Sequence, residues 1–194
     1  MSGDPAAASL HLERLGALAI ATAGEHAQTI ARIVTLVTEA FARGNKLMFC
    51  GNGGSAADAQ HLATEYVVRF RTERRPLPAL ALTTDTSLLT AASNDFGFEQ
   101  VFARQVRALG APGDVLFLHS TSGESPNLIA AAVAARGQGV TTVAMLARGG
   151  GALRGEVDHA LVLETDNGAH AQELHLAIGH AICEQVERWA AGQG

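Results

Sequence analysis

The stretch LMFCGNGGSAADAQH, residues 47–61, decides the fold of this chain. The apolar run from Lys46 to Cys50 is typical of a buried strand, and the residues after Ser55 follow a helical pattern. The glycines at positions 51, 53 and 54 let backbone N–H groups approach an anion at the positive end of the helix dipole. The sequence therefore predicts a strand, an anion-binding loop and a helix in direct succession.

The predicted helix also carries His61 and Glu65, which are four residues apart and so share one helix face. Such a pair can chelate one metal ion, as the paired ligands of helical zinc sites do. Taken alone, a surface pair is the commoner explanation of this spacing.

Composition limits the classes of protein to consider. The chain has 194 residues, of which 47% are hydrophobic and 17% charged, and a net charge of −5. This balance argues against a general nucleic-acid or membrane-surface binder; the one basic patch comprises Arg69, Arg71, Arg74 and Arg75. Cys50 and Cys183 lie in apolar segments, as expected for free buried thiols. With no secretory signal and no stretch long enough to span a bilayer, we expect a cytoplasmic protein.

Strand-like and helix-like segments alternate along the chain. The predicted strands are residues 46–50, 79–82, 115–119, 141–146 and 160–163. The predicted helices between and after them are residues 55–70, 86–92, 98–109, 127–136 and 170–191. This order predicts an α/β fold with a doubly wound, five-stranded parallel sheet in three layers, of the flavodoxin-like type.

A long helical region precedes the sheet. Residues from about Leu10 to Phe41 have a helical period, and Gly24 and Glu25 suggest a break between two helices. We therefore expect one domain, residues 1–194, with N-terminal helices in 1–43 and an α/β core in 44–194. Because apolar residues of these helices extend beyond one stripe, we expect them to pack between subunits, as a dimer of dimers; the extra residues include Leu15, Leu18 and Ile20.

A second loop, residues 120–125 with the sequence STSGES, follows the third predicted strand. Its hydroxyl groups and glycine precede Pro126 and a helix, an arrangement suited to a phosphate. A plain turn with an N-cap is the alternative. Since ligands bind beyond the carboxyl ends of parallel strands, where the Gly51 loop also lies, we favour phosphate.

A nicotinamide dinucleotide site is an alternative, because Gly51, Gly53 and Ala56 nearly fit a Rossmann fingerprint. The acidic residue of that fingerprint is expected about 20 residues further on. Here Asp85 follows Gly51 by 34 residues, and a second phosphate loop is not part of the pattern. We therefore do not favour a dinucleotide site.

Several motifs together resemble one family. The run from Gly51 to His61 with Glu65, the segment NDFG at 94–97, the loop 120–125, and QELH at 172–175 with His180 are similar to the bacterial phosphoheptose isomerases of the sugar isomerase (SIS) domain family. The resemblance covers nearly the whole chain in order and spacing. It implies a homotetramer that interconverts D-sedoheptulose 7-phosphate and D-glycero-D-manno-heptose 7-phosphate, the first step of heptose precursor synthesis, with one zinc ion per subunit.

The resemblance also implies site residues. For the metal these are His61, Glu65, Gln172 and His180, with Glu65 and His180 as the catalytic acid–base pair. For the substrate they are Asn52, Gly53, Gly54, Glu65, Asn94, Asp95, Ser120, Thr121, Ser122, Ser125 and Gln172. Gln172 and His180 are eight residues apart, so they lie within about 80° of each other on a helix. His170, Ala171 and Glu124 depart from the family pattern.

Two alternatives to an isomerase remain at this point. A SIS-fold adaptor that binds a protein such as a replication initiator should lack part of the set formed by His61, Glu65, Gln172 and His180, and this chain keeps all four. A sugar-phosphate sensor needs the Ser120 loop but no catalytic base.

Overall fold

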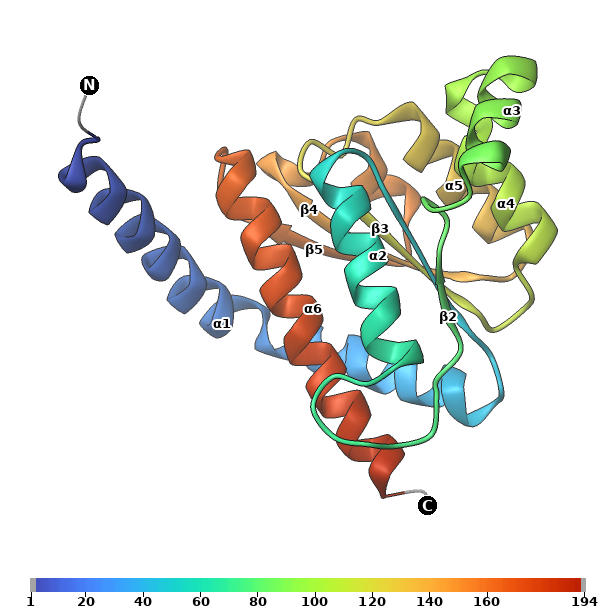
Figure 1. Cartoon of the computed structure of the whole chain (residues 1–194), viewed down its shortest axis with the longest axis horizontal. Coiled ribbons are helices and arrows are strands. Elements are labelled where there is room, and N and C mark those ends of the chain that lie inside the picture. Colours follow the sequence, from blue (N-terminus) through green and yellow to red (C-terminus); the bar gives the residue numbers. More distant parts are fainter. Residues whose placement is uncertain (1–2, 193–194) are drawn as a thin grey trace.

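The computed structural model describes residues 3–192, so the first two and last two residues of the predicted domain lie outside the described range. Five parallel strands form one sheet with helices on both faces (Figure 1). The strands are β1 (Leu47–Gly51), β2 (Ala79–Ala81), β3 (Val115–Ser120), β4 (Thr141–Ala147) and β5 (His159–Leu163). Their order, β2-β1-β3-β4-β5, confirms the predicted doubly wound fold.

Each face of the sheet has its own apolar core. Alternate strand residues such as Phe49 and Phe117 pack against α1 (Pro5–Ala42), α2 (Gly54–Val67) and α6 (Gly168–Ala191). The other strand residues, such as Met48 and Leu118, pack against α3 (Thr86–Phe96), α4 (Val101–Leu109) and α5 (Pro126–Gly137). Three short 3₁₀ helices complete the described part of the chain: η1 (Phe98–Gln100), η2 (Arg148–Gly150) and η3 (Ala152–Glu156).

The predicted break near Gly24 and Glu25 is wrong, because α1 is one helix from Pro5 to Ala42. A glycine in a helix costs only about 1 kcal/mol relative to alanine. Helix-forming residues on both sides of Gly24 and the packing of Ile33, Val37 and Phe41 in the core outweigh that cost.

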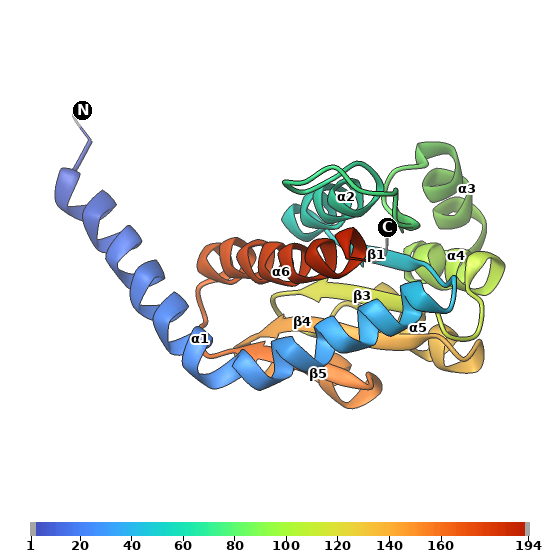
Figure 2. The same ribbon diagram turned by 90° about the horizontal axis from the view of Figure 1, so that it is seen from below.

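The first half of α1 projects away from the body of the molecule (Figure 2). Leu15 and Leu18 pack partly against the core, whereas Leu12 is 65% exposed and Ile20 is 79% exposed. This apolar surface on an extended helix is the part of the chain that the oligomer prediction concerns.

Several helix boundaries differ from prediction, and two of the differences have a clear cause in the structure. α2 ends at Val67, not at Phe70, because the chain beyond it turns around a buried carboxylate described below. α3 continues to Phe96 and includes Asn94 and Asp95, which were expected in a turn; it ends at Gly97, whose φ is +82°. Within residues 3–192, no helix has the length and hydrophobicity needed to cross a membrane.

Candidate active site

The ends of β1 and β3 lie side by side, since Gly51 pairs with His119 in the sheet. Strand order reverses here: the chain passes from β1 to β2 on one side of β1, whereas β3, β4 and β5 follow on its other side. A cavity of about 110 Å³ lies at this edge, lined by Asn52, Ser55, His119, Ser120, Thr121, Ser122, Ser125 and Gln172. The two predicted loops therefore meet at one cavity.

The hydroxyl groups of the Ser120 loop are held by the loop itself. The N–H of Gly123 donates to Ser120 Oγ at 3.0 Å, and the N–H of Glu124 donates to Ser122 Oγ at 3.2 Å. Because each oxygen accepts from the backbone, its own hydrogen is left to donate to an anion in the cavity.

Two helices begin at this cavity without a side-chain cap; α4, which continues directly from η1, also lacks one. In the described chain, the N-cap residues Gly53 of α2 and Ser125 of α5 make no side-chain capping bond. The N-caps of α1, α3 and α6 do make one, through Asp4, Asp85 and Asn167. Free N–H groups at a helix start, together with the helix dipole, attract an anion. The missing caps are thus typical of a phosphate site.

Glycine is required in the first loop. A Cβ at Gly51 would lie 2.6 Å from the carbonyl oxygen of Ser55, and one at Gly54 would lie 2.7 Å from Gln172 Oε1. Gly53 has a φ of +58°, in the region that favours glycine. The Gln172 side chain therefore packs directly over the Gly51 loop.

A second group lies between α2 and α6. His61 Nε2 is 2.9 Å from His180 Nε2 and 3.3 Å from Glu65 Oε1. The close approach of the helices depends on Gly179, since a Cβ there would lie 2.6 Å from Leu62 Cδ2. Gly179 and Leu62 are the sequence neighbours of His180 and His61, so their contact brings the two imidazoles together.

Burial and nearby charges in this group favour a neutral His180 imidazole and a protonated Asp58 carboxyl group. Burial lowers the pKa of His180; His61 and Arg71 lower it further, and Glu65 acts in the opposite direction. Neutral imidazole can accept a proton or bind a metal. Burial also raises the pKa of Asp58 to about 6, against the opposing effect of His61. Sequence analysis did not single out Asp58.

Comparison with known proteins decides the family. Residues 12–147 match the SIS domain family. The chain belongs to the SIS domain family. Within it, the chain belongs with the phosphoheptose isomerases. It is 53% identical to the phosphoheptose isomerase of Nitratidesulfovibrio vulgaris, over 85% of this chain and 79% of the relative. It is 56% identical to the phosphoheptose isomerase of Roseiflexus sp., over 84% of this chain and 82% of the relative.

Solved structures agree. A phosphoheptose isomerase from Francisella tularensis superposes with a TM-score of 0.93 at 34% identity, covering 96% of this chain and all of the other. One from Neisseria gonorrhoeae has a TM-score of 0.88 at 38% identity, covering 93% and 97%. The relatives are aldose–ketose isomerases, so this chain is an enzyme of that class.

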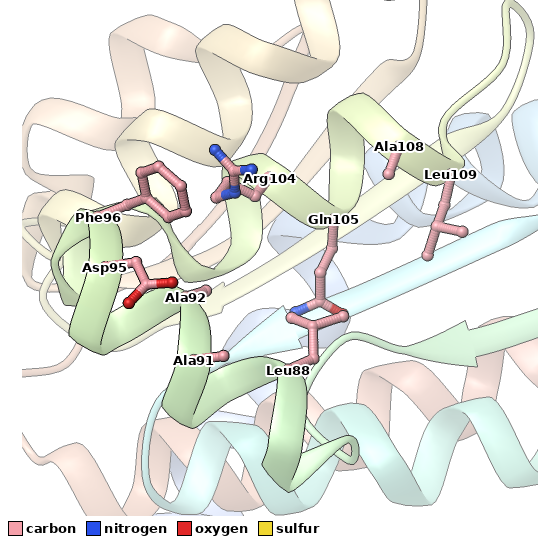
Figure 3. Close-up of a pocket in the computed structure, with 9 residues that line it drawn as sticks. All are labelled: Leu88, Ala91, Ala92, Asp95, Phe96, Arg104, Gln105, Ala108 and Leu109. Carbon is pink, nitrogen blue, oxygen red and sulfur yellow. The ribbon is translucent and has the colours of Figure 1, made fainter.

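Not all predicted site residues of this SIS domain lie in the cavity. Asn94 Nδ2 donates to Asp95 Oδ1 at 2.8 Å, and neither residue is among the described residues lining the cavity. Asp95 instead lines an apolar groove of about 370 Å³ between α3 and α4, near Phe96, over which Arg104 is stacked (Figure 3). Their role in substrate binding stays a prediction.

Two residues near the loops bear on the cavity, and sequence analysis missed the first of them. Asn127 exchanges two hydrogen bonds with Asn52, of 2.8 and 2.9 Å, and so orients that amide at the cavity. Glu124, one of the departures from the family pattern, accepts a hydrogen bond from the N–H of Ala152 at 3.0 Å and is not among the described residues that line the cavity. Its charge is therefore held outside the cavity.

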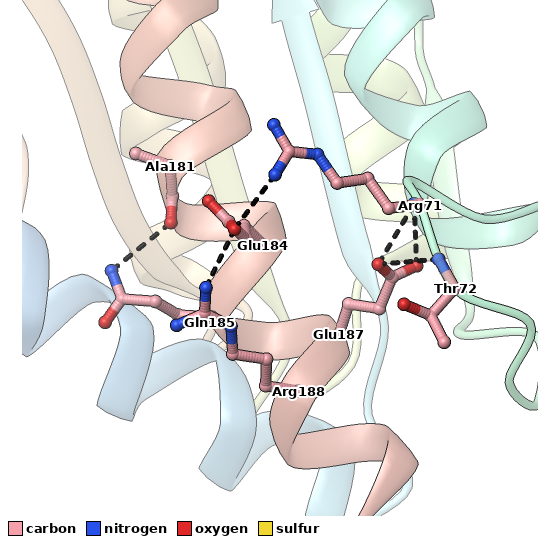
Figure 4. Close-up of polar contacts among 7 residues, drawn as sticks. All are labelled: Arg71, Thr72, Ala181, Glu184, Gln185, Glu187 and Arg188. Atoms are coloured by element: carbon pink, nitrogen blue, oxygen red, sulfur yellow. Dashed lines mark hydrogen bonds and ion pairs between the residues drawn. The ribbon is translucent and has the colours of Figure 1, made fainter.

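Glu187 is a further residue that sequence analysis missed. Its buried carboxylate accepts the backbone N–H groups of Arg71 and Thr72 at 3.0 to 3.2 Å (Figure 4). It also accepts the N–H of Phe70 at 3.0 Å. The Phe70 ring stacks on the His180 ring, with centroids 5.2 Å apart. Glu187 thus fixes the segment that covers His180.

His175 is a core residue: it is fully buried, and its Nε2 lies 3.1 Å from the carbonyl oxygen of Leu146. Burial lowers the pKa of His175 to about 4 and that of nearby His119 to about 3. Cys50 and Cys183 are free and buried, as predicted.

Proposed function

We propose that this chain interconverts D-sedoheptulose 7-phosphate and D-glycero-D-manno-heptose 7-phosphate through an enediolate. One observation supports this most: the two helices that carry the His61–Glu65–His180 group also border the anion cavity, because α2 begins at the Gly51 loop and Gln172 of α6 lines the cavity. An aldose–ketose isomerase needs both, a site for the distant phosphate and a base at the reacting carbons.

The phosphate would lie among the Ser120 loop hydroxyls and the starts of α2 and α5, which lack side-chain caps. Binding there fixes one end of an open-chain sugar, so that C1 and C2 reach the second group. Contacts of Asn52, Gln172, Asn94 and Asp95 with sugar hydroxyls are part of this proposal.

Proton transfer is assigned to Glu65 and His180. Glu65 has a side chain only 16% exposed, which shields the transferred proton from bulk water. In this proposal Glu65 takes the proton from the carbon next to the carbonyl and returns it to the former carbonyl carbon. His180, neutral because its pKa is lowered, moves the hydroxyl proton.

The residues also fit a metal ion. Two donors bound at 2.0–2.1 Å with a tetrahedral angle lie roughly 3.3 Å apart. The separations of 2.9 and 3.3 Å from His61 Nε2 are close to that value. We propose one zinc ion per subunit, held by His61, Glu65 and His180. The amide of Gln172, the fourth ligand that the family resemblance implies, packs over the Gly51 loop about 12 Å along α6 from His180, so it would have to move to reach this ion. Such an ion would supply Lewis-acid stabilisation of the developing oxyanion. An amide is a weak ligand for zinc, so we expect the ion to exchange readily.

We further propose that the enzyme is a homotetramer in the cytoplasm. The exposed Leu12 and Ile20 of α1 and the two free cysteines support this.

The test is turnover of D-sedoheptulose 7-phosphate by the wild type and by Glu65→Gln. The variant keeps size and most hydrogen bonding but lacks the base, so turnover should fall by about 10²–10⁴-fold. Glu99→Gln, at an exposed site, is the control and should retain full turnover.

Zinc content and exchange of the substrate C1 proton with deuterated solvent are measured on the same samples. A Glu65→Gln sample that retains zinc and loses exchange identifies Glu65 as the base. Near-normal exchange in that variant would transfer the role to His180. A wild type that binds the sugar phosphate without turnover would point to a sensor instead.

A further inference from the structure

A second cluster of metal-ligand side chains lies at the start of α6. His11 of α1, together with His170 and Glu173 of α6, offers three ligand atoms that all lie within 4.8 Å of one another. His11 Nδ1 is 3.2 Å from His170 Nε2, and His11 Nε2 is 3.7 Å from Glu173 Oε1. We propose that these side chains bind a second divalent transition-metal ion, of which zinc is the first candidate, and that this ion ties α1 to α6.

The donor set suits such an ion. Two imidazoles and one carboxylate form a common set of protein ligands for zinc, with water in the remaining position. The 3.2 Å between the two imidazole nitrogens is close to the roughly 3.3 Å that tetrahedral coordination requires. Glu173 reaches the same point by a side-chain rotation, because its side chain is 45% exposed.

The position of His170 is fixed before any metal binds. The residue is 4% exposed. It stands in the first turn of α6, where Asn167 Oδ1 accepts the N–H groups of Ala169 and His170. His11 packs edge-on against it, with ring centroids 4.4 Å apart. One ligand is thus held rigidly, and the two half-exposed ligands leave a path for the ion.

Charge supports a cation at this place. With both histidines neutral, the three ligands carry one negative charge, from Glu173. The positive end of the α6 dipole opposes a cation weakly, and the adjacent carboxylate offsets this effect. In the absence of metal, the carboxylate of Glu173 pairs with His11 alone among residues 3–192.

The new site is separate from the active-site group. His170 and His180 are ten residues apart on one helix, which corresponds to about 15 Å. Two ions can therefore bind independently. Because His11 lies on the projecting half of α1, the second ion would set the angle at which that half leaves the body (Figure 2).

The test uses the full chain, stripped of metal with a chelator and titrated with Zn²⁺ in competition with a chromophoric chelator. The wild type should bind two ions and His61→Ala one. In the His61→Ala background, His11→Gln or His170→Gln should weaken the remaining site at least ~10-fold. His26→Gln, also on α1, is the matched control and should leave that site unchanged. Since the proposal concerns the ion that His61→Ala leaves behind, it stands or fails independently of the proposed catalytic zinc.

Co²⁺ gives a second measurement. The His61→Ala protein should show the visible absorption of Co²⁺ bound by nitrogen and oxygen ligands, and the added His11→Gln should abolish it. Circular dichroism of the metal-free variants checks that they fold. If His61→Ala binds no ion, or if His11→Gln and His170→Gln bind Zn²⁺ as tightly as His61→Ala alone, the second site does not exist.

Discussion

Individual hydroxyl groups decide how tightly the cavity at the ends of β1 and β3 holds an anion. The Ser122 hydroxyl is one of them, because its oxygen accepts the N–H of Glu124 and its hydrogen is left for a ligand. Such a donor to a charged oxygen contributes ~1.5–3 kcal/mol. We therefore predict that Ser122→Ala raises KM by at least ~10-fold, and that inorganic phosphate competes with the substrate.

Steady-state kinetics with and without phosphate check this prediction. Ser87→Ala, at an exposed position on α3, serves as control and should leave KM unchanged. An unchanged KM in Ser122→Ala and no competition by phosphate would place the anion site elsewhere.

At the residue scale, sequence identified what a motif carries and missed what only the fold brings together. The spacing of His61 and Glu65 placed them on one helix face and the family resemblance gave them a role, while the loop hydroxyls were singled out by their place after a strand. Asn127 and Glu187 lie far along the chain from the groups they hold, Asn52 and the segment after α2. No local pattern marks such partners, because their meaning depends on which elements meet.

At the element scale, the segment between α2 and β2 depends on Glu187. Burial raises the pKa of Glu187, but hydrogen bonds from Thr72, Arg71 and Phe70 outweigh this, so the pKa lies below its usual range. The carboxylate therefore stabilises the fold at pH values above the ordinary glutamate pKa. That stabilisation is lost as pH falls through the lowered value.

We predict that Glu187→Gln is destabilising by on the order of 3 kcal/mol, because it leaves the buried Arg74 without its counter-charge. It should also lower kcat more than it changes KM, since Phe70 no longer holds His180 in place. Below pH 4.5, the ordinary pKa of glutamate, the stability of Glu187→Gln should depend less on pH than that of the wild type.

Urea unfolding at several pH values and steady-state kinetics measure both effects. Glu184→Gln is the matched control on α6: its ion pairs with Arg71 and Arg188 are largely exposed and contribute at most about 1 kcal/mol. Equal behaviour of the two variants would refute a special role for Glu187.

The strands and the order of elements could be predicted because apolar runs and turns are local signals. The continuity of α1 past Gly24 could not, since packing of its second half in the core decides it. The end of α2 at Val67 was missed for a similar reason: three N–H groups that would extend the helix are taken by Glu187 of α6.

At the scale of the whole molecule, the projecting half of α1 suggests assembly. We predict that light scattering at micromolar concentration gives four times the chain mass. Leu12→Glu combined with Ile20→Glu should lower that mass, because two charges would be buried between subunits. Exposed Leu109, on α4, changed to Glu is the control. A monomeric wild type would contradict the prediction.

The uncapped starts of α2 and α5 have a consequence for the balance between stability and activity. Without ligand, these two helix starts lack the side-chain cap that α1, α3 and α6 have; in our proposal the phosphate of the substrate takes the place of that cap. Ser125 has the extended backbone of an N-cap, with φ −72° and ψ 116°. We predict that Ser125→Asp raises the midpoint of thermal unfolding without ligand. An aspartate caps α5, and its negative charge stabilises the helix through the dipole by about 0.3–1 kcal/mol.

The carboxylate introduced by Ser125→Asp should repel phosphate and abolish activity. Thermal unfolding with increasing phosphate distinguishes the two proteins. At a phosphate concentration of a hundred times Kd, the free energy of unfolding of the wild type should rise by ~2.7 kcal/mol, and that of Ser125→Asp should not change. Asp85→Ala, which removes the cap of α3, should cost about 1 kcal/mol whether phosphate is present or not. The absence of these caps would thus lower the stability of the free enzyme and let the phosphate of its substrate act as a helix cap.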